Sequence, residues 1–110
     1  VVAVAIEAPT KTDPGTVAFY RAATLERLSQ VTVGALPDML TFTPDGRSVV
    51  VANEGEPSAT YAVDPEGSVS VIDVRTITAP TVRTATFAAF DAQEAALRAA
   101  GVRIYGPRAR

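Results

Sequence analysis

The sequence predicts an all-β fold of four-stranded antiparallel units, a β-propeller fragment with one short helix near the C-terminus. The first observation is an internal repeat, because the β-rich runs at residues 2–6 and 16–19 return at 49–53 and 68–71. The second is that each copy joins its two strands through a polar loop containing an Asp-Pro pair. Tandem β-repeats of about 50 residues are typical of propeller blades. We therefore expect about one and three-quarter blades.

The first unit, residues 1–36, is expected to supply strands two, three and four of one blade. Residues 1–7 alternate apolar and small side chains and stop before Pro9, which cannot donate to a strand ladder. An Asp-Pro-Gly turn leads into a strand at 16–21. A further strand at 28–33 ends before a glycine.

The second unit, residues 37–88, is expected to be a complete blade. Its first hairpin turns at Thr43-Pro44-Asp45-Gly46, with proline at the second turn position. The four expected strands are residues 38–43, 47–53, 67–74 and 81–87. The residues expected to pack between sheets are Leu40, Phe42, Val49, Val51, Val69, Val71 and Phe87.

The last segment, residues 89–110, lacks the strand pattern of the two units before it. Asp91 and Glu94 have the spacing of a capping box and precede an alanine-rich run that ends at a glycine, which predicts a short helix. Residues 102–105 are expected to form a short strand or an extended connector. Residues 106–110 are expected to be disordered or to link this blade to the next.

Composition narrows the possible functions. With 12 acidic and 10 basic residues, the formal net charge is -2, which gives no electrostatic basis for binding nucleic acid or an anionic membrane. Cysteine and histidine are absent, which excludes disulfides, thiolate metal sites and histidine-dependent catalysis. No apolar run approaches the roughly 18 to 20 residues of a membrane span. Binding of hard cations by oxygen ligands is the main metal chemistry that remains.

Several motifs resemble one bacterial family. Residues 31–46 are VTVGALPDMLTFTPDG, residues 51–58 are VANEGEPS and residues 63–73 are VDPEGSVSVID. With LRAAGVRIYGP at 97–107, these runs resemble the choice-of-anchor I family. Residues 50–53 also take the place of the Tyr-Val-Thr-Asn strand in a broader group of short-repeat surface propellers.

The resemblance implies a propeller of about seven blades in an exported or surface-attached bacterial protein. It therefore implies a secreted, periplasmic or cell-surface location. The implied partners are the rest of the same propeller and proteins of the cell envelope or surface layer.

The long loop in the second unit, residues 54–66, is the candidate functional site. In a propeller, this loop and the entry to the innermost strand open on one face, near the central channel. Ca²⁺ takes about 6 to 8 oxygen ligands from carboxylates, amides and carbonyls. The expected metal ligands are Asp38, Asn53, Glu54, Glu56, Asp64 and Glu66.

A solvated loop without a ligand is the alternative explanation of these acids. Turn chemistry accounts for the run Asp64-Pro65-Glu66-Gly67, and the spacing matches no EF-hand. The length of the loop favours a function, because most hairpin connections take about 2 to 5 residues. Both explanations stay open.

Two classes of function also stay open. We expect a non-enzymatic binding or scaffolding segment of a surface propeller. The alternative is part of a Ca²⁺-dependent phosphatase or phytase-like enzyme, a label that some relatives carry. Phosphoryl transfer needs Arg or Lys groups on the phosphate, and Lys11, Arg47 and Arg75 lie at strand ends or in loops with no motif around them.

An autonomous small β-domain is a third possibility. Blades bury their faces against neighbours on both sides, and repeat units generally need at least about three copies for stability. The sequence therefore favours a fragment of a larger assembly.

Overall fold

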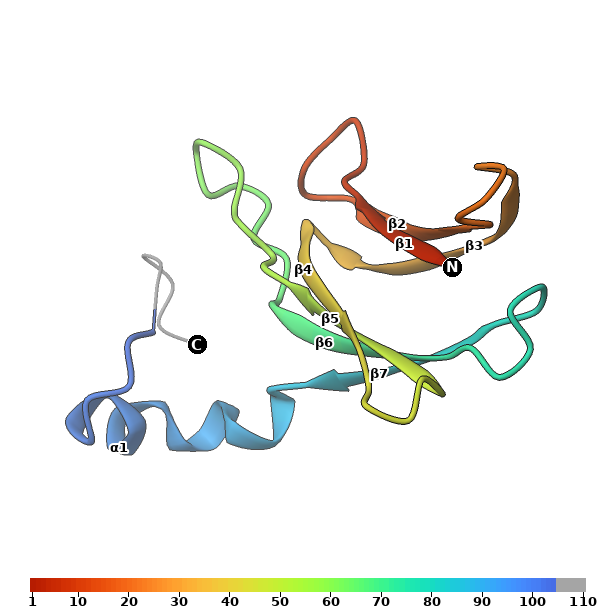
Figure 1. Ribbon diagram of the computed structural model, residues 1–110. Helices are drawn as coiled ribbons and strands as arrows, with labels where there is room; N and C mark the ends of the chain where they lie inside the picture. Colours follow the sequence, from red (N-terminus) through yellow and green to blue (C-terminus); the bar gives the residue numbers. More distant parts are fainter. Residues whose placement is uncertain (105–110) are drawn as a thin grey trace.

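The computed structural model describes residues 1–104, which form two antiparallel β-sheets followed by two short helical segments (Figure 1). Residues 102–104 form no strand, in agreement with an extended connector. The expected linker at 106–110 lies outside the described residues. In chain order the elements are β1 (Val2–Ile6), β2 (Pro14–Tyr20), β3 (Arg27–Ala35), β4 (Pro37–Phe42), β5 (Ser48–Asn53), β6 (Ser68–Asp73), β7 (Thr81–Thr86), the 3₁₀ helix η1 (Ala88–Gln93) and α1 (Glu94–Ala99).

The two sheets confirm the predicted all-β class. The first sheet has the order β1-β2-β3 and the second has the order β4-β5-β6-β7, with antiparallel pairing throughout. One sheet lies over the other, and the helical segments extend away from both (Figure 1). Three strands followed by four are compatible with one incomplete and one complete propeller blade.

The internal repeat is preserved in the pairing of the strands. When the two copies of the repeat are aligned by sequence, the β1–β2 pair and the β5–β6 pair have the same register. Register decides which side chains share a face, so each face of the first sheet has a defined equivalent in the second. Val2↔Tyr20 matches Val49↔Ile72, Ala3↔Phe19 matches Val50↔Val71, Val4↔Ala18 matches Val51↔Ser70, Ala5↔Val17 matches Ala52↔Val69, and Ile6↔Thr16 matches Asn53↔Ser68.

The hydrophobic core lies between the two sheets. Its buried members are Val17, Phe19, Val33, Val49, Val51, Ile72 and Val74. Full burial of a Val, Ile or Phe side chain contributes about 1.5–3 kcal/mol, so this layer supplies most of the attraction between the sheets. The hydroxyl of Ser29 adds a polar link by donating to the backbone oxygen of Ile77 over 2.6 Å.

At one end of the interface, the sheets approach so closely that a glycine is required. A Cβ added to Gly34 of β3 would lie 2.7 Å from Ser68 Oγ and 2.8 Å from Asn53 Cβ. Asn53 is buried there, and its Nδ2 donates to Ser68 Oγ over 3.1 Å and to Ser70 Oγ over 2.9 Å. These polar side chains take the place of apolar packing at this end of the core.

The predicted core is confirmed at Leu40, Val49 and Val51 and is wrong at the other four positions. Val69 and Val71 lie on the opposite face of β6, because the alternation of the strand turns Ile72 and the two serines toward the first sheet. Phe42, on edge strand β4, is 38% exposed, and Phe87, which follows edge strand β7, is 59% exposed. An edge strand has a neighbour on one side only, so its aromatic residues are less covered.

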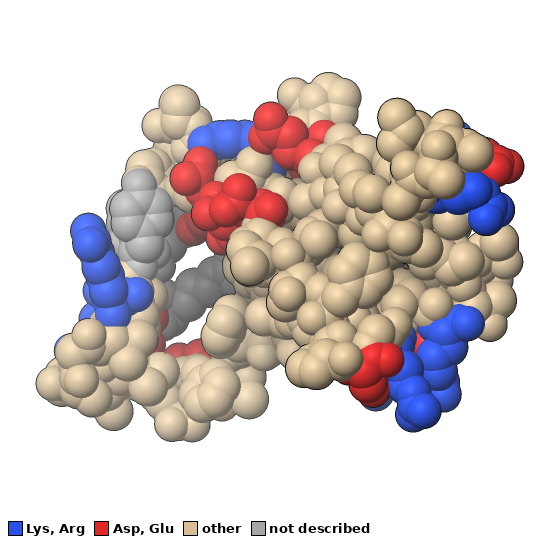
Figure 2. Space-filling model, in the orientation of Figure 1, with Lys and Arg blue, Asp and Glu red and all other residues tan. Residues whose placement is uncertain are grey.

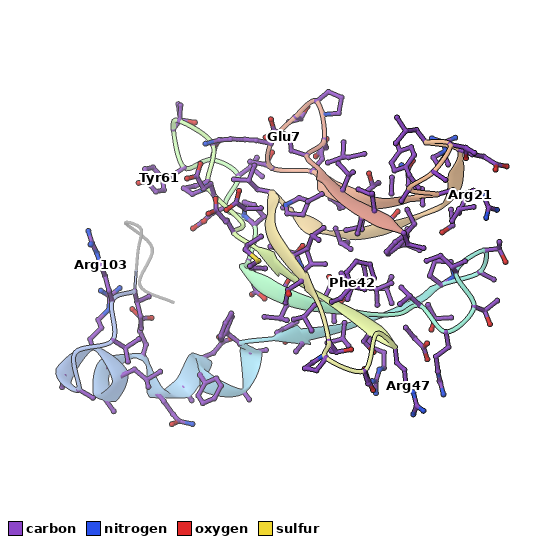
Figure 3. The ribbon with its side chains drawn as sticks, in the orientation of Figure 1. Glu7, Arg21, Phe42, Arg47, Tyr61 and Arg103 are labelled. Atoms are coloured by element: carbon purple, nitrogen blue, oxygen red, sulfur yellow. The ribbon has the colours of Figure 1, made fainter. Side chains whose placement is uncertain are left out.

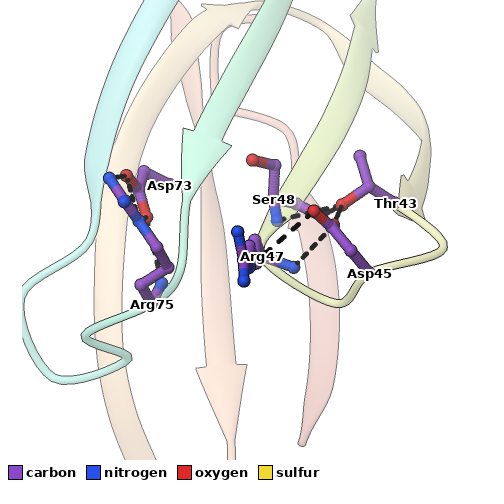
Figure 4. A network of polar contacts seen from close by, with 6 residues as sticks. All are labelled: Thr43, Asp45, Arg47, Ser48, Asp73 and Arg75. Carbon is purple, nitrogen blue, oxygen red and sulfur yellow. Dashed lines mark hydrogen bonds and ion pairs between the residues drawn. The ribbon is translucent and has the colours of Figure 1, made fainter.

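The predicted turn between β4 and β5 is confirmed. The backbone N–H of Gly46 donates to Thr43 O over 2.8 Å. The carboxylate of Asp45 accepts from Thr43 Oγ1 over 2.6 Å and from the backbone N–H of Arg47 over 3.1 Å (Figure 4). These hydrogen bonds lower the pKa of Asp45 below its ordinary value of 3.8. Asp45 therefore stabilises the turn as an ionised acceptor.

The predicted helix near the C-terminus is present, but the capping box is wrong. Asp91 lies within η1, and α1 begins three residues later at Glu94. An N-cap needs a non-helical backbone, which a residue inside a 3₁₀ helix does not have. Glu94 instead accepts from Arg98 Nε over 2.9 Å, one helical turn further on.

Candidate functional site

The candidate site is built around the acidic loop, residues 54–67, which connects β5 to β6. The backbone N–H of Glu54 donates to Leu36 O over 2.9 Å, and that of Gly55 donates to Ala35 O over 3.1 Å. Ala35 ends β3 of the first sheet, and Leu36 links it to β4 of the second. The base of the loop is therefore fixed to both sheets at once.

Gly55 is required by the geometry of this base. Its φ is +65°, and an added Cβ would lie 2.6 Å from the backbone carbon and oxygen of Glu66. The two ends of the loop thus meet at the glycine. Positive φ and close backbone approach are both conditions that favour glycine over any other residue.

The outer part of the loop is organised by its own hydrogen bonds. The backbone N–H of Ser58 donates to Val63 O over 2.8 Å, and the backbone N–H of Val63 donates to Ser58 Oγ over 3.2 Å. Tyr61 lies at the end of the loop with a positive φ of 57° and projects from it in Figure 3. This part of the chain protrudes beyond the sheets, where it is accessible to a partner.

Six carboxylates line a hollow of about 680 Å³ between the acidic loop and the helical segments. Four come from the loop, and two come from η1 and α1. They are Glu54, Glu56, Asp64, Glu66, Asp91 and Glu94. Figure 2 shows acidic side chains gathered beside this hollow, which we call the acidic hollow.

Glu56 and Glu94 each lie beside a basic side chain. Lys11 Nζ lies 3.1 Å from Glu56 Oε2, which connects the loop of the first sheet to that of the second. Arg98 Nε lies 2.9 Å from Glu94 Oε1. The Lys11–Glu56 pair is exposed on both sides, and exposed ion pairs contribute little to stability, about 0–1 kcal/mol.

The structure brings together only part of the expected metal-ligand set. Four of the six expected ligands line the acidic hollow. Asp38 lies in a bulge of β4 on an exposed part of the strand, outside this lining. Asn53 is turned to the interior, where its Nδ2 is bonded to two serines and its buried Oδ1 has no hydrogen-bond partner. Within residues 1–104, no three acidic side chains are grouped closely enough to hold a metal ion.

Asp91 and Glu94 are not among the metal ligands that the sequence predicts. They are separated from the acidic loop by two strands, β6 and β7, and were interpreted only as helix-capping residues. No spacing in the sequence links them to Glu54 or Asp64, because the approach is produced by the path of the chain after β7 (Figure 1). The acidic hollow is therefore a tertiary feature.

A second hollow, of about 470 Å³, lies beside β6. An ion pair between Asp73 and Arg75 forms part of its lining. The guanidinium of Arg75 donates to both carboxylate oxygens of Asp73, and the backbone N–H of Arg75 donates to Asp73 Oδ1 over 3.0 Å (Figure 4). These bonds lower the pKa of Asp73 to about 2. The two partners are only two positions apart in the sequence, which is typical of a contact that stabilises the local backbone.

The three basic residues considered for phosphate binding each lie beside a carboxylate. Lys11 is paired with Glu56, and Arg75 is paired with Asp73. Arg47 Nε lies 3.9 Å from Asp45 Oδ2 at the turn. Arg47 and Arg75 thus have their nearest acidic partner on the same turn or strand end, away from the acidic hollow.

Comparison with known proteins gives the family. A family model described as "Choice-of-anchor I domain" matches residues 1–110. No curated protein and no solved structure matches the chain. The helices of residues 1–104 include none with the length and apolar character needed to cross a bilayer. The chain therefore belongs to the choice-of-anchor I domain family, which associates it with the bacterial cell surface.

Proposed function

We propose that this chain is a non-enzymatic binding or scaffolding segment of an exported or cell-surface bacterial β-propeller protein. The observation that carries the proposal is the stacking of two sheets with the same strand register, which is how consecutive blades of a propeller are related. The rest of the same propeller is then its first partner, packed on the outer faces of the two sheets.

The acidic loop is the part best suited to contact an external partner. Its base is held by backbone hydrogen bonds from Glu54 and Gly55 to Leu36 and Ala35, where β3 leads into β4, so the loop extends from a fixed support. Its outer part carries Tyr61, a residue type enriched at protein interfaces. Binding residues are often found on loops positioned by a rigid sheet scaffold. We propose proteins of the cell envelope or surface layer as these partners.

The arrangement of charges favours binding over phosphoryl transfer. Phosphoryl transfer needs metal ions and basic groups directed at one phosphate. Here Arg47 and Arg75 lie beside Asp45 and Asp73, away from the acidic hollow. Lys11 reaches the hollow only through its pair with Glu56.

Two measurements test the proposal. The native protein on intact bacteria is treated with protease, and we expect it to be digested while a cytoplasmic marker survives. The purified chain is incubated with p-nitrophenyl phosphate with and without Ca²⁺, and we expect no turnover. A protected protein would contradict surface exposure. Turnover that a chelator abolishes and Glu54→Gln reduces would contradict a non-enzymatic role.

A Ca²⁺ site in a phosphatase or phytase-like propeller is the second candidate function. It is favoured by one observation, that four of the expected ligands line a single hollow together with Asp91 and Glu94. Repulsion among these carboxylates is relieved by a divalent cation, since opposite charge within a few ångströms favours the ionised form. A site at this hollow requires the loop and helices to move closer around the ion.

Calcium binding is tested by thermal unfolding. A ligand that binds only the folded state raises Tm. At a free-ligand concentration of 100 times its Kd, it adds about 2.7 kcal/mol to the free energy of unfolding. If the site exists, Ca²⁺ raises Tm of the wild type and of the control Glu26→Gln, whose carboxylate lies in the β2–β3 turn. It does not raise Tm of Glu54→Gln or Asp64→Asn. Equal shifts in all four proteins would exclude the acidic hollow.

A further inference from the structure

The internal repeat shows which part of the acidic loop is additional to the common plan. The equivalent loop of the first unit, residues 7–15, has nine residues, whereas the acidic loop has fourteen. Both loops contain a glutamate, a proline and an Asp-Pro pair. Between the proline and the Asp-Pro pair, the first loop has Thr10-Lys11-Thr12 and the acidic loop has Ser-Ala-Thr-Tyr-Ala-Val at 58–63. We call residues 58–63 the loop tip.

The loop tip is held in one conformation by its own hydrogen bonds. The backbone N–H of Ser58 donates to Val63 O over 2.8 Å, and its backbone oxygen accepts from the N–H of Tyr61 over 2.9 Å. Its Oγ accepts from the backbone N–H of Val63 over 3.2 Å. The two residues that support the tip from below, Gly55 and Pro57, are buried. A preorganised segment loses little conformational entropy when it binds a partner.

The surface of the loop tip is neutral and largely apolar. None of its six residues carries a charge, and Val63 is 52% exposed. Tyr61 projects from the tip in Figure 3, and the tip lies beyond the ends of the strands in Figure 1. The exposed residues around Tyr61 are Ala59, Thr60, Ala62 and Val63. This surface is small enough to enter a pocket.

The backbone at Tyr61 is strained, with a φ of +57°. A left-handed backbone is unfavourable for an aromatic residue, and glycine, asparagine and aspartate are the usual residues there. A glycine would form the same turn with less strain, so the turn itself does not require a tyrosine. Strained residues of this kind are concentrated at functional sites. The tyrosine therefore points to a role for its side chain beyond the turn.

The stems of the loop on either side of the tip are acidic. Glu54 and Glu56 precede the tip, and Asp64 and Glu66 follow it. Lys11 of the first loop lies 3.1 Å from Glu56. One lysine beside four carboxylates leaves the base of the tip with negative charge. A neutral apolar tip thus rises from an acidic base.

We propose that the loop tip inserts into an apolar pocket of a cell-envelope protein, and that lysine or arginine side chains on the rim of this pocket face the acidic base. This inference rests on the envelope-binding function proposed above and specifies the chemistry of the partner. Protein interfaces commonly have an apolar centre and a polar rim. Tyrosine is enriched among the residues that carry most of the binding energy. Complementary charges on the rim speed association and exclude wrong partners.

The test measures binding of the labelled native protein to envelope fragments isolated from the bacterium that produces it. Tyr61→Gly removes the ring and relieves the positive φ, so we expect binding at least tenfold weaker and a Tm no lower than that of the wild type. The matched control is Leu25→Gly, in the β2–β3 turn at the other end of the sheets. Leu25 is also apolar, is 71% exposed and has a φ of +59°. Its replacement is expected to leave binding unchanged.

A second variant keeps the test decisive if Tyr61→Gly lowers Tm. Residues 58–63 are replaced by Thr-Lys-Thr, which already closes the equivalent strands of the first unit. This replacement is expected to retain the fold, as measured by circular dichroism, and to weaken binding at least tenfold. The rim is tested by salt, which screens charges that face each other. Binding of the wild type should weaken as salt rises, and Glu56→Gln combined with Asp64→Asn should reduce that dependence.

The outcomes separate this inference from the function on which it rests. Envelope binding that both tip variants leave unchanged would overturn the inference alone, because another surface would then hold the partner. A wild type that binds no envelope fragment would overturn the envelope-binding function as well. Binding that survives protease digestion of the fragments would show a polysaccharide or lipid partner and overturn the protein pocket. Binding that does not change with salt would overturn the basic rim.

Discussion

Two neighbouring valines of β5 test which face of the second sheet forms the core. Val49 is fully buried against the first sheet, whereas Val50 is half-buried on the outer side of the second sheet. Val49→Ala removes two carbon atoms, which costs about 1.6 kcal/mol at about 0.8 kcal/mol per buried carbon. The cavity left behind raises the expected loss to about 2–3 kcal/mol. Val50→Ala removes the same atoms from a site in partial contact with water, so about 1 kcal/mol or less is expected.

The assay is thermal unfolding followed by circular dichroism. A loss of about 2–3 kcal/mol lowers Tm of a domain of about 100 residues by roughly 8–20 °C. Both substitutions lose the same strand preference, so the difference between them reports burial alone. Equal losses, or a larger loss for Val50→Ala, would refute the assignment of the faces.

Three further predictions follow from close contacts and from one ion pair. Gly34→Ala places a Cβ 2.7 Å from Ser68 Oγ, so we expect a loss of about 1–3 kcal/mol in urea unfolding; an unchanged midpoint would contradict the close approach of the sheets. Gly55→Ala strains the loop base, and we expect faster proteolysis within the acidic loop, whereas an unchanged cleavage rate would show that the base tolerates a side chain. Because Arg75 holds the pKa of Asp73 at about 2, below 3.8, this pair stabilises the fold above pH 3.8 and loses its effect as pH falls toward 2. The Tm curves of the wild type and Asp73→Asn should therefore converge over that range, and a constant separation would contradict the prediction.

The order and class of the strands could be predicted from the sequence because each strand carries a local signal. Turn residues such as Pro44-Asp45-Gly46 end one strand and begin the next. β-branched runs between the turns have few alternatives to a strand. The internal repeat added the prediction that two units share one plan, and the common pairing register agrees with it.

The choice of core face could not be predicted in the same way. Strand β6 has valines on one side and serines with an isoleucine on the other, and hydrophobicity favours the valines. The structure buries the serines because Asn53 on β5 needs hydrogen-bond partners at the close approach of Gly34. Buried polar groups are stable when they are paired with one another, and a single strand does not show which pairs form.

The candidate site shows the same division between sequence and structure. The acidic loop could be predicted from its length and its carboxylates, which are local properties. The inward turn of Asn53, the bulge at Asp38 and the approach of Asp91 and Glu94 depend on residues far away in the chain. No spacing rule covers them.

By itself, the sequence determined the strands, the turns, the repeat and the family resemblance, since these arise from neighbouring residues and their periodicity. Only the tertiary structure decided which side of each sheet packs against the other sheet and which carboxylates share a hollow. The physical reason is that a strand leaves both of its faces available to a partner. The choice between them is made by the whole sheet that packs against it, through shape, hydrogen bonding and the area removed from water.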